Sequence, residues 1–394
     1  MTLSSEALDF ISGRRRLFAV HQSYANAGYR DLLRRVAREV PSAALGSVVS
    51  LSTSTPANAA ARMALGTRAH IQLADPQLWK HDTSGWPAVK PGEPKKAFTY
   101  SWWPSAKPHS APVDAAWVAE VLQTQRDAGA NLLLSATGWV EPSNARKSLD
   151  DATRWVQASR DAVLGEPMLV NLAFDLSWLS NPTQRSMLLT ELVESTESLW
   201  YLRFFWPTNT VRYGQLARAD VLDGYAELVA VAAAEDKRLV LANTGLTGWV
   251  ATALGGAGLS TGNSWPEQAF VDSPGGGGGK GARKERYFDV NVLHTVEHPA
   301  QTRLARQTGY VRCTCAYCTS LFGGGPWSHA YAGSHGVMKA AALTEGIISA
   351  PNPRASAHAT VTSAIAFNAR LTGTAALSGN DRPRHLPLWD QLLR

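Results

Sequence analysis

The chain has 394 residues, of which 45% are hydrophobic and 18% are charged, and its formal net charge at pH 7 is +6. This composition is too apolar for a disordered chain and supplies enough apolar side chains for a sizeable core. The excess of Lys and Arg favours an anionic partner such as nucleic acid, without requiring one. No apolar run approaches the roughly 20 residues that span a bilayer, so we expect no membrane partner.

The three Cys of the chain all lie within residues 313–318. An odd, tightly clustered set cannot form a disulfide framework and fits a reducing compartment. Residues 1–10 lack the apolar segment of a signal peptide and are followed by Arg14, Arg15 and Arg16. Together these features predict a cytoplasmic protein.

Short apolar runs alternate with helical stretches along most of the chain, which predicts βαβ units and a parallel sheet. We predict strands over residues 47–52, 70–74, 131–135, 168–174, 200–205, 238–242 and 257–261, with an eighth over either 287–292 or 309–313. The helices expected between them cover residues 113–128, 145–164, 182–197, 217–235 and 247–254. Eight strands with intervening helices favour an α/β fold of the (β/α)₈ TIM-like barrel type over an open doubly-wound sheet.

The predicted organisation has three parts, with the barrel in the middle. Residues 1–46 form an N-terminal helical extension, 47–312 form the barrel, and 313–394 form a C-terminal zinc-binding helical region. A loop over residues 77–112, rich in Trp and Pro, interrupts the barrel. A loop of this length is expected to be a lid or specificity loop, or else a packed surface insertion.

The Cys cluster predicts a metal site. Cys313, Cys315 and Cys318 place three sulfur ligands on one tight turn, and thiolates are preferred in structural zinc sites. A fourth ligand is required, and histidine is the expected type. The residue spacing leaves several histidines open for this role: His329, His335 and His358, with His294 and His298 behind them. A closed Cys₃His site would be structural rather than catalytic.

Polar residues at predicted strand ends are candidates for a ligand site. Asp75 and Asp175 each end an apolar run, and strand ends face the active site in barrel enzymes. A carboxylate there serves as a nucleophile, as a base or as an acceptor for nucleobase N–H groups. The alternative is a helix cap or a salt bridge. Further candidates of the same kind, which would bind substrate or cap helices, are Asn243, Thr261 and Asn263.

Three segments resemble the tRNA-guanine transglycosylase family, including its branch that inserts 7-deazaguanines into DNA. Residues 310–318 (Tyr-Val-Arg-Cys-Thr-Cys-Ala-Tyr-Cys) look like the C-x-C-x-x-C zinc motif of the family. Residues 172–175 (Leu-Ala-Phe-Asp) look like the strand whose Asp binds the base. Residues 70–75 (His-Ile-Gln-Leu-Ala-Asp) look like the strand that ends in an Asp at the base pocket.

The resemblance implies a (β/α)₈ barrel with a structural Zn²⁺ and an activity that exchanges guanine for a 7-deazaguanine in tRNA or DNA. It ranks His358 first as the fourth zinc ligand, because the zinc His of the family opens the last helix. It assigns the nucleophilic role to Asp289, with Asp272 behind it, and a catalytic, base-orienting role to Asp75. A base flipped out of the nucleic acid would stack on Trp79 or Trp103.

Two other interpretations remain open. Residues 287–306 also have a helical pattern, which would remove Asp289 from an active site. The chain would then be a catalytically inactive zinc-containing barrel that binds nucleic acid or a nucleobase. A barrel enzyme of another class, such as a glycosidase or a deaminase, is the third interpretation. The absence of His-x-Glu before the Cys cluster argues against a zinc deaminase. The sequence leaves a homo-oligomer open.

Overall fold

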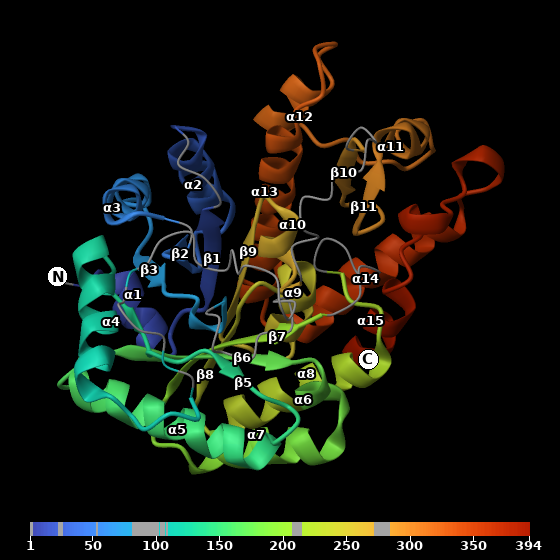
Figure 1. Ribbon diagram of the computed structural model, residues 1–394. Coiled ribbons are helices and arrows are strands. Elements are labelled where there is room, and N and C mark those ends of the chain that lie inside the picture. Colours follow the sequence, from blue (N-terminus) through green and yellow to red (C-terminus); the bar gives the residue numbers. More distant parts are fainter. Residues whose placement is uncertain are drawn as a thin grey trace, which may run out of the picture.

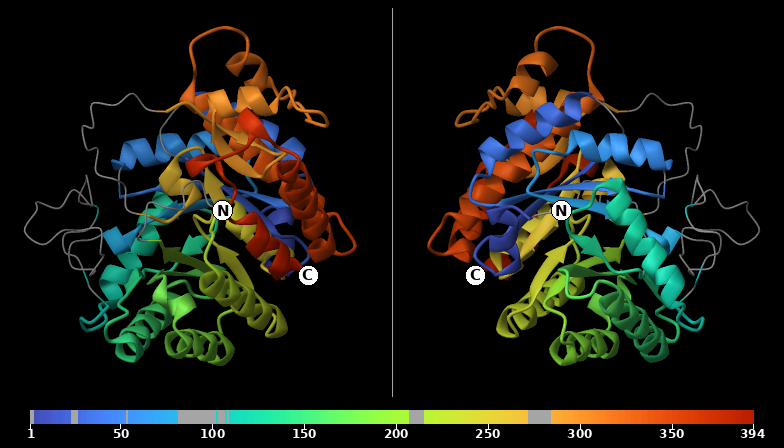
Figure 2. Two further views of the ribbon diagram at one scale, coloured as in Figure 1. Left: turned by 90° about the vertical axis from the view of Figure 1, so that its right-hand side faces the viewer. Right: turned by 90° about the vertical axis from the view of Figure 1, so that its left-hand side faces the viewer.

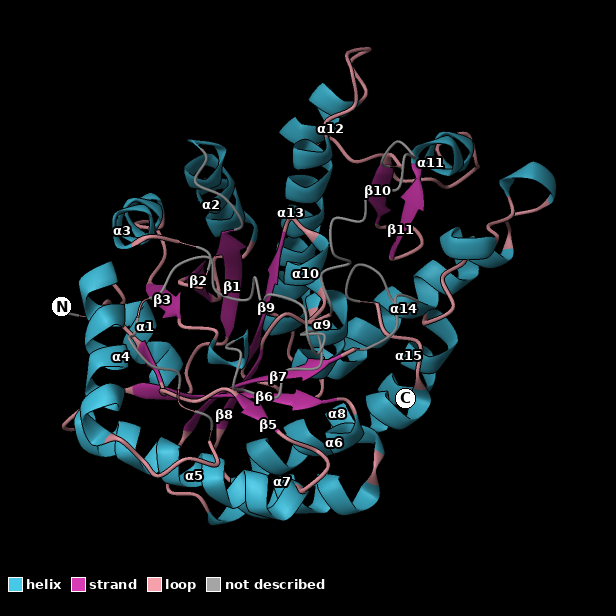
Figure 3. Ribbon diagram, in the orientation of Figure 1, coloured by secondary structure: helices cyan, strands magenta, loops and turns pink. Residues whose placement is uncertain are grey.

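A computed structural model describes residues 3–22, 27–52, 54–80, 102, 107, 109–206, 215–271 and 284–394. Parallel strands form a nearly closed barrel with eight strand positions, and helices surround it (Figures 1 and 3). The strands are β1 (Leu17–Gln22), β2 (Ala44–Ser50), β3 (Ile71–Asp75), β4 (Leu133–Leu134), β5 (Trp139–Val140), β6 (Met168–Asp175), β7 (Leu199–Phe205), β8 (Arg238–Leu241) and β9 (Gly258–Gly262). Their order around the barrel is β3-β2-β1-β9-β8-β7-β6-β4, and β5 also pairs with β6.

The barrel is closed where its first and last strands meet, and it has one gap elsewhere. The first and last strands pair directly, with Leu17 opposite Gly258. The remaining gap, between β3 and β4, is bridged by Asn131, whose backbone N–H donates to the Gln72 carbonyl at 3.2 Å. The Asn131 side chain accepts from the Gln72 N–H at 2.7 Å. The short strands β4 and β5 therefore share one position beside β6.

A helix follows each strand position. These helices are α2 (Ala27–Glu39), α3 (Pro56–Leu65), α4 (Ala115–Ala128), α5 (Ala145–Ala162), α6 (Ser177–Ser180) with α7 (Pro182–Glu194), α8 (Ala219–Ala234), α9 (Gly245–Ala253) and α13 (His329–Ile348). Capping residues explain several of their boundaries. The Asn181 side chain accepts from two N–H groups at the start of α7, where Pro182 follows it. Gly129 ends α4 in the left-handed conformation, at φ 104°.

The eighth helix comes late in the sequence. Helix α13 packs against α9, α2 and β9, so it completes the ring of helices around the barrel. Between β9 and α13 the chain forms a long insertion that contains α10 (Trp265–Gln268), an antiparallel hairpin of β10 (Arg286–Asp289) and β11 (His294–Glu297), α11 (His298–Leu304) and α12 (Ala316–Leu321). The hairpin and α11 lie outside the barrel (Figure 1).

The remaining helices flank the barrel. The chain begins with α1 (Ser5–Ile11) and ends with α14 (Pro353–Ala369) and α15 (Leu386–Leu393). Phe10 of α1 packs with Leu17, Val48 and Leu73 in a cluster that fills one end of the barrel. In Figure 2 the C-terminal helices, orange to red, lie on the opposite side of the strands from the green helices α5 to α7.

Two sequence predictions about the strands are wrong. The first barrel strand is β1, within the region expected to be only a helical extension. All six of its residues are buried, and so short an apolar run cannot be distinguished from a buried helix by periodicity. The expected eighth strand over 287–292 overlaps the hairpin strand β10 instead, and residues 309–313 contain no strand. A domain boundary at residue 312 would separate α13 from the barrel that it completes.

Candidate functional site

The predicted Cys cluster is completed by a histidine on helix α13. The three sulfur atoms and Nδ1 of His335 all lie within 4.8 Å of one another. Nδ1 is 3.3 Å from Sγ of Cys315, 3.3 Å from Sγ of Cys318 and 3.8 Å from Sγ of Cys313. Four ligand atoms gathered in this way could hold a metal ion.

Secondary structure and hydrogen bonds orient these ligands. Cys315 caps the N-terminus of α12, and its backbone N–H donates to Sγ of Cys313 at 3.4 Å. The Nε2 atom of His335 is 2.9 Å from the carbonyl oxygen of Phe288 on β10. Because a carbonyl can only accept, Nε2 carries the proton and Nδ1 keeps a free lone pair for a metal.

The aromatic ring of Tyr287 supports the same cluster. It stacks on the His335 imidazole with ring centroids 4.3 Å apart and an interplanar angle of 14°. Its hydroxyl lies 3.2 Å from Sγ of Cys318. The candidate metal centre thus joins three parts of the chain: the Cys turn, the barrel helix α13 and the hairpin strand β10.

His358, ranked first as the fourth ligand, is not part of this group. Its Nε2 atom lies 3.0 Å from a carboxylate oxygen of Asp390, so it links α14 to α15. The family-based expectation of a His at the start of the last helix is therefore wrong here, and His335, one of the histidines left open by the spacing, takes the place. His294 and His298 contact Gln215 and Glu285 instead.

Asp75 lies in the interior of the barrel. Its carboxylate forms an ion pair with Arg203 at 3.0 Å, and both side chains are fully buried. Arg203 also donates to Asn171 at 3.1 Å, and its guanidinium carbon lies 3.7 Å from the ring centroid of Trp79. The carboxylate is thus committed to a charge partner inside the fold.

An aromatic cluster lies beside this ion pair. Trp79, Trp139, Phe205 and Phe270 pack together with edge-on ring contacts. Trp79 is only 2% exposed, so in this structure its ring has no open face on which a base could stack. The other Trp expected to stack on a base, Trp103, and the alternative nucleophile Asp272 lie outside the described residues.

The other predicted carboxylates have structural partners. Asp175 accepts a hydrogen bond from the backbone N–H of Ser177 at 2.9 Å in a local turn, whereas the N-cap residue of α6 is Leu176. Asp289 is 1% exposed and accepts from Asn291 and, at 2.8 Å, from the hydroxyl of Tyr310. Burial raises the pKa of Asp289 above its usual value.

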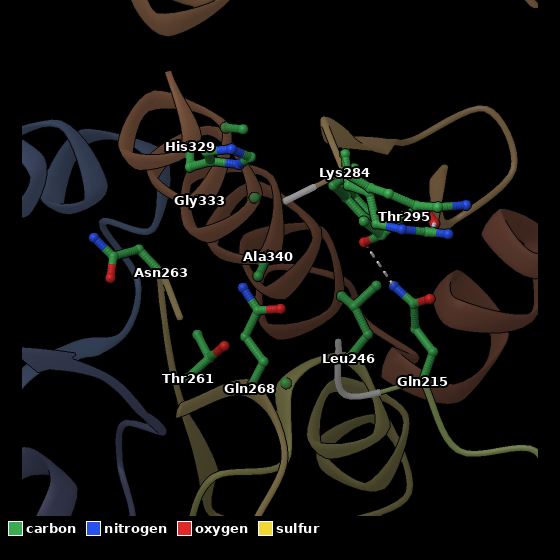
Figure 4. A pocket seen from close by; sticks show the side chains of 15 residues that line it. Gln215, Leu246, Thr261, Asn263, Gln268, Lys284, Thr295, His329, Gly333 and Ala340 are labelled. Carbon is green, nitrogen blue, oxygen red and sulfur yellow. Dashed lines mark hydrogen bonds between the residues drawn. The ribbon is translucent and has the colours of Figure 1, made fainter. Parts of the chain in front are cut away.

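A cleft of about 330 Å³ lies between the end of β9, the hairpin and α13 (Figure 4). Thr261 and Asn263, two of the predicted ligand-binding residues, line it. Asn243 is not among the lining residues; its backbone N–H donates to the Ser260 hydroxyl at 2.8 Å. Among the other lining residues, the sequence points to His329 only as a possible metal ligand and to Lys284 and Arg286 only as basic residues that could meet phosphate. No sequence signal indicates the remaining side chains of the cleft: Gln215, Leu246, Gln268, Phe288 and Thr295.

The alternation of side chains along β10 determines what faces the cleft. Arg286 and Phe288 line it, whereas Tyr287 faces the Cys cluster and Asp289 faces Tyr310. Successive strand residues point to opposite sides, so Asp289 lies on the far face of the wall formed by Phe288. Among the described lining residues there is no carboxylate.

Small residues let helix α13 form the other wall of the cleft. A side chain at Gly333 would meet the Asn263 carbonyl oxygen at 2.3 Å, so only glycine permits this close approach. Gly336 and Ala340 line the cleft further along the same helix. Since His335 lies between two of these wall residues, a metal on its Nδ1 would hold this wall against the hairpin.

The polar groups of the cleft include three amides and two cations. Gln268 donates to the Gly262 carbonyl at 2.9 Å. Gln215 donates to Thr295 at 3.5 Å (Figure 4). Arg286 pairs with Glu297 at 3.2 Å and with Asp381 at 3.4 Å. These ion pairs fix the guanidinium at the cleft wall.

No protein-family model and no curated protein matches this chain. The resemblance of its three segments to the tRNA-guanine transglycosylases therefore stays a prediction. None of the helices that the structure describes combines the length and the apolar composition needed to cross a membrane.

Proposed function

We propose that this protein binds a nucleobase, presented by nucleic acid, in the cleft between the end of β9 and helix α13. The observation that carries the proposal is the cleft lining, in which the amides of Gln215, Asn263 and Gln268 accompany the cations Lys284 and Arg286. Amide groups offer a donor and an acceptor in one plane, which matches the edge of a purine or pyrimidine. The cleft volume of about 330 Å³ is at the small end of ligand sites and suits a single base.

The charge of the chain supports nucleic acid as the source of this base. The formal net charge is +6, and Lys284, which lines the cleft and pairs with Glu297, is exposed. Lysine and arginine side chains bind phosphates of either DNA or RNA through charge alone. A cleft lined by amides and by the cations Lys284 and Arg286, with no carboxylate among the described lining residues, therefore fits a base attached to a phosphodiester chain.

We infer that the ion held by the Cys₃His group is a structural Zn²⁺. Zinc bonds of about 2.3 Å to sulfur and 2.0–2.1 Å to nitrogen put tetrahedral ligand atoms roughly 3.5–3.8 Å apart. The separations of 3.3–3.8 Å around His335 are close to this range. With four protein ligands the site has no open position for a substrate, so its role would be to fix β10 and α13 as walls of the cleft.

The position of the cleft also supports a barrel of the TIM type. Thr261 and Asn263 stand at and just after the carboxyl end of β9. Barrel enzymes bind their ligands at this end of the strands.

Base exchange of the 7-deazaguanine type is the second candidate function. The resemblance of residues 310–318 and 172–175 favours it. It requires a carboxylate that attacks the ribose C1′ and displaces the base, giving a covalent intermediate. Because no described residue that lines the cleft is acidic, we favour binding of a nucleobase over base exchange.

Fluorescence anisotropy with labelled single-stranded RNA and DNA tests the proposed binding. Gln268→Ala removes one amide from the cleft, whereas Gln157→Ala removes an amide from the exposed surface of α5 and serves as the matched control. We expect salt-dependent binding that is weakened by Gln268→Ala and unchanged by Gln157→Ala. Binding of neither polymer, or equal affinity of the two variants, would refute the proposal.

A further inference from the structure

A second cavity of about 300 Å³ lies between helix α2 and the segment that carries the metal ligands. It is lined by Arg35 of α2, by Tyr317 of the Cys turn and by Tyr331 of α13. Asn263 lines this cavity and also the nucleobase cleft described above. The two cavities are therefore neighbours on either side of one residue.

The second cavity contains an aromatic surface that is open to solvent. Tyr331 is 45% exposed, which is unusual for a large aromatic side chain. The buried ring of Tyr317 lies behind it, with centroids 5.9 Å apart and an interplanar angle of 38°. The guanidinium of Arg35 lies 5.6 Å from the Tyr317 centroid and pairs with Asp31 at 2.6 Å. The exposed ring is thus supported by a packed layer beneath it.

Helix α2 carries further cations beside the one that lines the cavity, Arg35. Arg30, Arg34 and Arg38 recur at intervals of four residues on the adjoining side of the helix, where Arg34 pairs with Asp31. Arg30 and Arg38 are exposed. An aromatic ring for stacking beside a row of cations is the arrangement that proteins use to bind single strands without reading their sequence.

We propose that the second cavity binds the nucleotide adjacent to the one in the nucleobase cleft, on the same single strand of RNA or DNA. Its base stacks on Tyr331, and the phosphates that follow leave the cavity past Arg35 toward the arginines on the adjoining side of α2. The inference rests on the proposed function, because it requires a nucleobase in the first cleft. It extends that function from one base to a strand that passes over Asn263.

The test measures the affinity of single-stranded RNA and DNA oligonucleotides of about ten nucleotides, a length within the usual site sizes. Tyr331→Ala removes the stacking ring from an exposed position, so the variant is expected to fold. We expect a roughly ten-fold loss of affinity, the size typical of one stacked base. Tyr331→Phe keeps the ring and should keep the affinity. Comparing the two polymers shows which one is preferred.

Three other results would each reject a different part of the proposal. If Tyr331→Ala binds as the wild type does while Gln268→Ala binds weakly, the second subsite is wrong and the nucleobase cleft stands. If Tyr331→Phe loses as much affinity as Tyr331→Ala, the contact is a hydrogen bond and not stacking. If the wild type binds neither polymer, the proposed function itself fails.

Discussion

The imidazole of His335 donates from Nε2 to the backbone carbonyl of Phe288 at a distance of 2.9 Å. One ring therefore connects the candidate metal centre, through Nδ1, to the strand whose Phe288 side chain forms the cleft wall. A metal on Nδ1 would restrict both the helix that carries His335 and the strand that carries Phe288. The metal centre and the nucleobase cleft are thus expected to respond together to mutation.

The identity of the fourth ligand gives the first prediction. His335→Ala removes one of four ligands, so the purified protein should contain less than one zinc per chain and should unfold at a lower temperature. His358→Ala is the matched control, because it breaks only a partly exposed contact with Asp390 that contributes about 1 kcal/mol or less. Metal analysis by plasma mass spectrometry and thermal unfolding check both. Loss of zinc in His358→Ala, with zinc retained in His335→Ala, would restore the family-based ligand.

The same connection predicts that zinc supports nucleic-acid binding without contacting the ligand. If the Cys₃His group holds zinc as proposed, its removal with a chelator should free α13 from β10 and lower the affinity of the cleft for a single strand. The measurement is anisotropy before and after chelation, with zinc added back as the control. Unchanged affinity in metal-free, folded protein would show that the cleft does not depend on the metal centre.

The buried ion pair inside the barrel should matter for stability. Asp75→Ala leaves Arg203 charged and without its carboxylate in a fully buried position, and such a change typically costs about 3–5 kcal/mol. Replacing both residues, as in Asp75→Leu with Arg203→Met, should cost less than the two single changes added together. Urea unfolding measures these free energies. A near-wild-type stability of Asp75→Ala would show that the pair is not buried as described.

The buried histidine of β1 predicts loss of stability in acid. His21 is 7% exposed, and burial lowers its pKa from 6.5 to about 3. In the unfolded chain this histidine binds a proton below pH 6.5, whereas in the folded chain it stays neutral until about pH 3. Stability therefore falls as the pH decreases through this window, by about 2 kcal/mol at pH 5 from this residue alone. Urea midpoints at pH 7 and pH 5 should differ less in His21→Asn than in the wild type. An equal difference in both proteins would contradict the assignment.

The environment of Asp289 distinguishes binding from base exchange. Asp289→Asn replaces the carboxylate that accepts the Tyr310 hydrogen bond with a weaker amide acceptor. We therefore expect the free energy of unfolding to fall by about 1–3 kcal/mol, with no loss of nucleic-acid affinity. The wild type should form no adduct with RNA or DNA that survives a denaturing gel. An adduct that is lost in Asp289→Asn would instead establish base exchange and a rearranged hairpin.

Most of the barrel is predictable because its strands from β2 to β9 are apolar runs bounded by polar or glycine residues. Strand β1 is not predictable in the same way, because all six of its residues are buried and show no alternation of polar and apolar side chains. A hairpin strand such as β10 has the same local sequence pattern as a barrel strand. That α13 completes the ring of helices around the barrel is also hidden, since the long insertion separates it from β9.

The site is predictable where the signal is local and hidden where it depends on packing. The Cys spacing identifies three ligands, but only the approach of α13 to β10 selects His335. Thr261 and Asn263 are predictable as lining residues of the cleft because they lie at the end of a strand. Asp75 has the same kind of place, yet its partner Arg203 comes from a distant strand and turns it into an interior ion pair.

The central claim is that the cleft lined by Asn263, Gln268 and Arg286 receives a nucleobase. Photocrosslinking with single-stranded oligonucleotides that carry a 4-thio base, followed by peptide mapping, tests it most directly. We predict crosslinks to peptides from β9 and α10, from the β10–β11 hairpin or from the first half of α13. Crosslinks confined to other surfaces, such as the outer helices α4 to α7, would contradict the assignment of the cleft.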